Sequence, residues 1–138
     1  LGHAGTLFAR VCRCTQLCAL RWCRGMSSIV QLDPQQLATW PADMLIIDVR
    51  EAWELELAHL RHLPALAVRH IPLGQFPLRV AELDQLEQEG KTLGLLCHHG
   101  VRSMNAAHYL LQQGFERVAN ITGGIDAWAR TDAGIGRY

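Results

Sequence analysis

A short apolar run that ends in a cysteine, followed by a tight turn and a helical pattern, constrains this chain most. Residues 93–96 are typical of a buried strand, and Cys97 follows them directly. From Ser103 onward, apolar side chains recur at helical spacing, and Gly114 predicts the end of that helix. The pattern therefore places the Cys97 thiol where a strand ends and a helix begins. Free backbone N–H groups at such a point favour a thiolate and attract anions.

Strand-like and helical patterns alternate along the rest of the sequence. Asp33 and Pro34 predict a helix start, as the N-cap and the first helical residue. We expect strands at residues 44–49, 93–96 and 117–121, an extended segment at 70–73, an irregular one at 58–67, and helices at 51–57, 74–89 and 103–113. We expect Leu78, Leu83, Trp53 and Trp128 to face the core. This alternation predicts an α/β fold in which helices cover both faces of a parallel sheet, with ligands at the carboxyl ends of its strands.

Residues 1–25 do not follow this pattern. They contain four arginines, no acidic residue, and four of the five cysteines, namely Cys12, Cys14, Cys18 and Cys23. A four-thiolate zinc site, a targeting peptide and sequence upstream of a start at Met26 are three possible interpretations. We favour the start at Met26, because ordinary domain sequence follows it at once. The length of 138 residues then predicts a single domain over residues 26–138.

The charge pattern excludes several classes of partner. Residues 26–138 carry 9 basic and 13 acidic side chains, so the body is mildly acidic and lacks the clustered Lys and Arg of a nucleic-acid-binding surface. No apolar run approaches the length that a membrane-spanning helix needs. We therefore expect neither nucleic acid nor membrane as a partner, and a cytoplasmic location.

Four segments resemble one known family. The sequence Cys-His-His-Gly-Val-Arg-Ser at residues 97–103 resembles the active-site loop of the rhodanese family, the single-domain sulfurtransferases. The sequences Asp-Val-Arg-Glu at 48–51, His-Ile-Pro-Leu at 70–73 and Asn-Ile-Thr-Gly-Gly-Ile-Asp-Ala-Trp at 120–128 are similar to other segments of that family, in the same order. The resemblance extends from about residue 29 to residue 130.

The resemblance implies a rhodanese-like fold and a sulfurtransferase activity. Cys97 would take a sulfane sulfur from a donor such as thiosulfate, hold it as a persulfide, and pass it to cyanide, a thiol or a partner protein. The expected substrate-binding residues are His98, His99, Gly100, Val101, Arg102 and Ser103. Successive N–H groups of this loop would cradle the sulfur, while the Arg102 cation would meet the oxygens of thiosulfate. We expect no cofactor, and a monomer or a homodimer.

Four polar residues near the loop have supporting roles in this interpretation. We expect His98 and His99 to adjust the charge around the thiolate rather than to transfer protons. With Cys97 they lack a clear fourth ligand, so we expect no metal. Asp48 and Arg50, at the end of a core strand, are expected to support the loop through hydrogen bonds.

Two other functions are alternatives to sulfur transfer. A cysteine-based phosphatase or arsenate reductase needs a loop wide enough for a tetrahedral anion, but here four residues separate Cys97 from Arg102, which predicts a loop too small for phosphate. A non-catalytic interaction module would have no need of Cys97.

The sequence departs from the family pattern at residues 60–69, where a glycine is absent and the spacing is longer. We expect this change to affect the neighbouring surface and the choice of partner, not the cysteine loop.

Overall fold

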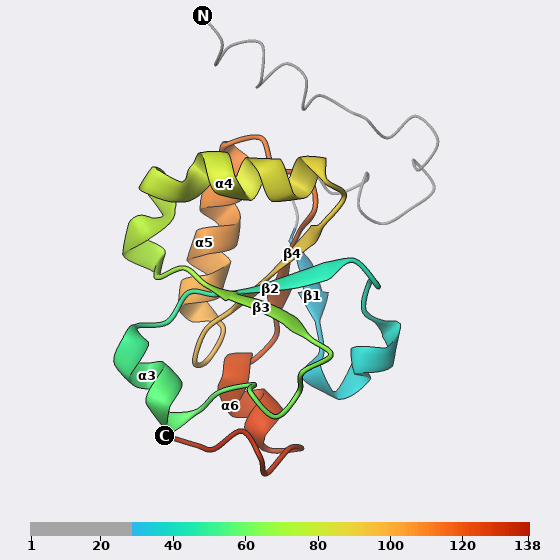
Figure 1. Ribbon diagram of the computed structural model, residues 1–138, viewed down its shortest axis with the longest axis vertical. Coiled ribbons are helices and arrows are strands. Elements are labelled where there is room, and N and C mark those ends of the chain that lie inside the picture. The colour runs from blue at the N-terminus through green and yellow to red at the C-terminus, as the bar shows by residue number, and fades with distance from the viewer. Residues whose placement is uncertain (1–28) are drawn as a thin grey trace, which may run out of the picture.

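The computed structural model describes residues 29–138, which fold around a five-stranded parallel sheet (Figure 1). The strand order is β1-β5-β4-β2-β3, so β4 lies in the centre and all pairs are parallel. The strands are β1 (Val30–Leu32), β2 (Met44–Asp48), β3 (Ala67–His70), β4 (Thr92–Leu96) and β5 (Val118–Ile121). This arrangement confirms the predicted α/β fold.

Helical segments connect the strands and cover the sheet on both sides. They are η1 (Pro34–Thr39), α3 (Ala52–Leu57), η2 (Leu73–Gln75), α4 (Phe76–Gln88), α5 (Val101–Gln112) and α6 (Gly124–Ala129). Figure 1 shows α4 and α5 on one side of the sheet and α6 on the other. As predicted, Asp33 caps η1 by accepting a hydrogen bond from the Gln35 N–H at 2.8 Å, although the segment is a 3-10 helix.

The central strands are buried on both faces, so their side chains divide between two cores. Leu45 and Ile47 of β2 pack with Leu83 of α4 on one side of the sheet. Ile46 of β2 packs with Trp128 of α6 on the other side. Because both cores reach the carboxyl ends of β2, β4 and β5, the loops that follow these strands have firm support.

Several local predictions were wrong. β3 spans Ala67–His70, whereas the sequence predicted an extended segment that begins at His70. Residues 67–70 lack the apolar pattern of a strand, and their extended conformation depends on pairing with β2. The Trp53 side chain is 63% exposed and Leu78 is 88% exposed. Helix α4 instead packs through residues such as Leu83, and α3 turns the charged Glu54 inward.

Residues 1–28 are not described, so the predictions about their four cysteines and about Met26 lie outside the described residues. Within residues 29–138, no helix combines the length and the apolar character that crossing a membrane requires.

Candidate active site

Cys97 lies at the centre of the carboxyl edge of the sheet, directly after β4. Its side chain is only 1% exposed, and the Gly100 N–H donates a hydrogen bond to its Sγ at 3.0 Å. Gly100 is the N-cap of α5, so the helix begins two residues earlier than predicted and brings its amino terminus closer to the sulfur. The sequence predicted several backbone N–H groups around the sulfur, and among residues 29–138 one of them, that of Gly100, donates to the Cys97 Sγ. Further N–H contacts to an outer sulfur remain a prediction.

Glycines allow the backbone of residues 123–124 to approach the cysteine loop closely. Gly100 has φ = 98°, a left-handed conformation that favours glycine, and a Cβ there would lie 3.3 Å from the Gly123 nitrogen. A Cβ on Gly124 would lie 2.5 Å from the carbonyl oxygens of Cys97 and His98. The first N–H groups of α6 then bind the same two carbonyls, with Ile125 donating to Cys97 at 2.8 Å. The turn at Gly123 and Gly124, which leads into α6, therefore also fixes the cysteine loop.

The sequence led us to expect a free Arg102 cation at the rim of the loop. In the structure Arg102 is instead paired with an acidic side chain. Its guanidinium donates two hydrogen bonds, at 2.6 and 2.7 Å, to the carboxylate of Glu54 on α3. Glu54 is only 2% exposed and also accepts a hydrogen bond from the Tyr138 hydroxyl at 2.9 Å. The hydrogen bonds from Arg102 lower the pKa of Glu54 to about 2, and this carboxylate in turn raises the pKa of Arg102.

Neither Glu54 nor Tyr138 was predicted to belong to the site. The sequence predicted only a short helix over residues 51–57. In the structure the Glu51 N–H donates to the Glu54 carboxylate at 2.8 Å, which completes a capping box at the start of α3. Nothing in the local sequence around Tyr138 indicates a contact with residues 84 positions away.

Asp48 and Arg50 reach the cysteine loop indirectly. The fully buried Arg50 guanidinium pairs with Asp48 at 2.8 Å and donates to the Ala58 carbonyl, just beyond α3, at 2.9 Å. It also donates to the Tyr138 hydroxyl at 3.2 Å. Although burial opposes the change, the hydrogen bond with Asp48 raises the pKa of Arg50. The pair thus anchors α3 and Tyr138, which together hold Glu54 against Arg102.

His98 is enclosed between two aromatic rings. Its imidazole stacks on Tyr138 with a centroid distance of 3.8 Å, and on His99 with a centroid distance of 3.9 Å. Burial, followed by the neighbouring His99 charge, lowers the pKa of His98 below its ordinary value. The lowered pKa favours the neutral form of His98, and its stacking on Tyr138 and His99 is a packing contact, while a role in adjusting the charge around the thiolate stays a prediction.

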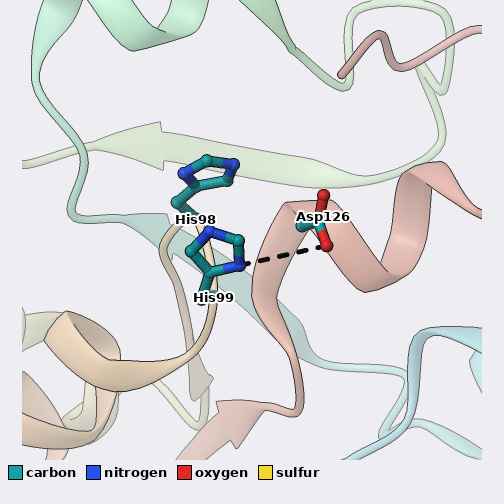
Figure 2. A group of neighbouring side chains, drawn as sticks. All are labelled: His98, His99 and Asp126. Carbon is teal, nitrogen blue, oxygen red and sulfur yellow. Dashed lines mark ion pairs between the residues drawn. The ribbon is translucent and has the colours of Figure 1, made fainter. Parts of the chain in front are cut away.

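Figure 2 shows His98 and His99 of the cysteine loop next to Asp126 of α6. Their ligand atoms all lie within 4.8 Å of one another, and His99 Nδ1 lies 3.9 Å from Asp126 Oδ2. Zinc bonds of about 2.0–2.1 Å require ligand atoms closer together than this, at about 3.4 Å in a tetrahedral site. Asp126 also pairs with Arg130 at 3.1 Å and Arg137 at 3.5 Å, and two guanidinium groups would repel a cation. The geometry therefore favours an ion-pair cluster over a metal site.

The segment that departs from the family pattern lines a separate cavity of about 270 Å³. Leu60, Leu63 and Val68 form part of its wall, and Asp48 and Arg50 line it as well. Cys97 is not among the residues that line this cavity, and the effect of the longer segment on the cysteine loop stays a prediction.

The comparisons with known proteins agree with this geometry. The family model described as the rhodanese-like domain matches residues 33–131, which include Cys97 and the glycines that support its loop. The chain belongs to the rhodanese-like domain family.

Curated relatives of this rhodanese-like chain are named as sulfurtransferases. It is 30% identical to a thiosulfate sulfurtransferase GlpE of Glaesserella parasuis over 78% of this chain and 94% of the relative. It is 33% identical to a sulfurtransferase of Allochromatium vinosum over 64% of this chain and 74% of the relative. Among solved structures, a rhodanese-related protein from Thermoplasma volcanium has a TM-score of 0.60 at 24% identity, with 75% of this chain and 93% of that chain covered. The protein is a rhodanese-type enzyme, and its general activity is sulfur transfer.

Proposed function

We propose that the protein moves a sulfane sulfur from a small anionic donor, such as thiosulfate, to a thiophilic acceptor through a persulfide on Cys97. The observation that carries the proposal is the buried Sγ of Cys97, which accepts the Gly100 N–H at the amino terminus of α5. A thiolate gains from this N–H and from the helix dipole. The same features suit the anionic outer sulfur of a persulfide.

The proposed reaction has two displacements. The Cys97 thiolate attacks the outer sulfur of thiosulfate, a new S–S bond forms, and sulfite leaves with the electron pair of the broken S–S bond. A thiolate or cyanide then attacks the outer sulfur of the persulfide, and Cys97 leaves as the thiolate. No net oxidant or reductant is needed.

Arg102 has a restricted role in this proposal. Glu54 accepts hydrogen bonds from two nitrogens of the guanidinium, and the other N–H positions of the group remain able to donate to a sulfonate oxygen. Because the pair is close to neutral, Arg102 would recognise the donor through directed hydrogen bonds rather than through net charge.

Mass spectrometry of the Cys97 peptide tests the proposal directly. After incubation with thiosulfate and without reductant, the peptide should gain the mass of one sulfur atom and lose it again when cyanide is added. Cys97→Ser, which keeps the volume but supplies a poor nucleophile, should remove both the added mass and thiosulfate:cyanide activity with its thermal unfolding little changed. Substantial activity in this variant would contradict the proposal. Efficient hydrolysis of an aryl phosphate by the unmodified protein would instead support the phosphatase alternative.

The acceptor, the cytoplasmic location and the monomeric or homodimeric state stay predictions of the sequence. A thiol acceptor and cyanide can be compared in the same assay, and light scattering measures the oligomeric state.

A further inference from the structure

A chain of buried hydrogen bonds extends from the Cys97 thiol across the carboxyl edge of the sheet. The Ser103 Oγ lies 3.2 Å from the Cys97 Sγ and donates to the Asn120 Oδ1 at 2.5 Å. Ser103 is fully buried in the first turns of α5, and Asn120 on β5 is only 3% exposed. Water therefore has little access to any of the three side chains.

The outer end of the chain fixes the direction of these hydrogen bonds. The Gln31 Nε2 donates to the thioether of Met104 at 3.2 Å, and a thioether has no hydrogen to give in return. The Gln31 Oε1 consequently faces inward, where it accepts from the Asn120 Nδ2 at 2.9 Å and from the Thr122 hydroxyl at 3.1 Å. This contact orients the Asn120 amide so that its Oδ1 faces Ser103.

The orientation of the amide decides where the Ser103 proton lies. A serine hydroxyl has one hydrogen, and the Asn120 Oδ1 can only accept. The hydroxyl therefore presents a lone pair to Cys97. We propose that Asn120 is a positioning residue, which holds the Ser103 hydroxyl proton so that Ser103 accepts a hydrogen bond from the Cys97 thiol and cannot donate one to the thiolate.

Loss of the Cys97 proton then disturbs the chain. If the Ser103 hydroxyl keeps its bond to Asn120, a lone pair faces the thiolate. If it turns toward the sulfur, the buried Asn120 Oδ1 loses its donor, and a buried unpaired acceptor is costly. The Gly100 N–H continues to donate to the sulfur in either case. Asn120 thus opposes the stabilisation of the thiolate that the amino terminus of α5 provides.

The consequence for sulfur transfer follows from the reactivity of thiolates. A less stabilised thiolate is a stronger nucleophile and a slower leaving group. The orientation of Asn120 therefore favours attack on the donor and slows the release of sulfur to the acceptor. This part of the inference rests on the proposed function, whereas the orientation of the hydroxyl does not.

Titratable groups surround the loop and could also influence the thiol. They are Arg102 with Glu54, His98, His99, Asp126, Tyr138, and the buried Asp48–Arg50 pair. Within residues 29–138 none of these groups forms a side-chain hydrogen bond with Ser103 or Asn120, so a shift caused by Asn120 variants reports on the hydroxyl.

The rate of Cys97 alkylation by iodoacetamide as a function of pH tests the proposal without any sulfur donor. In Asn120→Leu the Ser103 hydroxyl is free to donate to the thiolate, and the midpoint should move to lower pH by about half to one unit, the effect of one hydrogen bond. Gln31→Met, at an exposed position that does not endanger the fold, should allow the Asn120 amide to turn and should move the midpoint in the same direction by less. Gln36→Met, an exposed glutamine outside the chain, is the matched control and should leave the midpoint unchanged.

The Ser103→Ala background separates positioning from a general structural effect. Asn120→Leu should move the midpoint only when the Ser103 hydroxyl is present. An unchanged midpoint in both Asn120→Leu and Gln31→Met, or an equal shift with and without the hydroxyl, would overturn the proposal. Absence of sulfur on Cys97 would contradict the proposed function and leave this alkylation result unaffected.

Discussion

Glu54 on α3 and Arg102 on α5 form a two-point ion pair, with N···O distances of 2.6 and 2.7 Å, directly beside the cysteine loop. The carboxylate is buried while the guanidinium remains partly exposed. Arg102, the cation that the sequence predicts will bind the sulfur donor, is therefore already paired with Glu54. This pairing changes the expected effect of mutating either residue.

Removing the two partners together should distinguish recognition from loop support. Arg102→Ala alone leaves a buried carboxylate beside the thiolate, and it should lower the thiosulfate rate strongly for that reason. The double variant Arg102→Ala with Glu54→Gln removes the unpaired charge as well. If Arg102 recognises the donor, the double variant should still use thiosulfate poorly and accept sulfur from a neutral donor at close to the normal rate. Equal recovery with both donors would mean that Arg102 only holds the loop.

The same pair should make stability depend on pH in acid. The folded-state pKa of Glu54 is about 2, below its ordinary value of 4.5, so the pair stabilises the fold fully above pH 4.5 and the contribution is lost as the pH falls toward 2. Glu54→Gln should cost about 1–3 kcal/mol at neutral pH, since one partner is buried and the other is partly solvated. Urea unfolding at several pH values measures this: the difference between the two proteins should shrink below pH 4.5. A constant difference down to pH 2 would argue against the pair as its cause.

Gly100 and Gly90 offer a matched test of the cysteine loop. Both have strongly positive φ, 98° and 95°, but a Cβ meets the Gly123 nitrogen at 3.3 Å only at position 100 and meets nothing within 4 Å at position 90. Each change to alanine should cost about 1–2 kcal/mol through backbone strain. Only Gly100→Ala should also reduce sulfur transfer, because it moves the N–H that binds the Cys97 sulfur. Equal activity of the two variants would show that this N–H is dispensable.

Tyr138 should control the titration of His98. Burial is the main cause of the lowered pKa of His98, and the Tyr138 ring supplies one of its two stacking partners. Tyr138→Ala should therefore raise the pKa of His98 toward 6.5, as measured by NMR. Tyr138→Phe keeps the ring, so His98 should titrate as in the unmodified protein, although loss of the hydroxyl bond to Glu54 should cost about 1 kcal/mol. A normal titration in Tyr138→Ala would assign the shift to other neighbours.

Local sequence patterns predicted the elements that carry their own signal. The apolar run before Cys97 and the N-cap at Asp33 both specify structure through neighbouring residues, and each is found where it was expected. The edge strand β3 and the inward turn of Glu54 were not predicted. Each depends on a partner distant in sequence, β2 in the first case and Arg102 in the second.

The sequence by itself determined the alternating α/β architecture and the position of Cys97 between a strand and a helix, because periodicity and turn residues act over short distances. Only the tertiary structure decided the electrostatic state of the site. The parallel sheet brings the carboxyl ends of its strands to one edge, and there Glu54 pairs with Arg102, Tyr138 covers His98, and Asn120 binds Ser103. The separations in sequence run from 17 positions between Ser103 and Asn120 to 84 positions between Glu54 and Tyr138. No local pattern encodes a contact that depends on how the whole sheet is assembled.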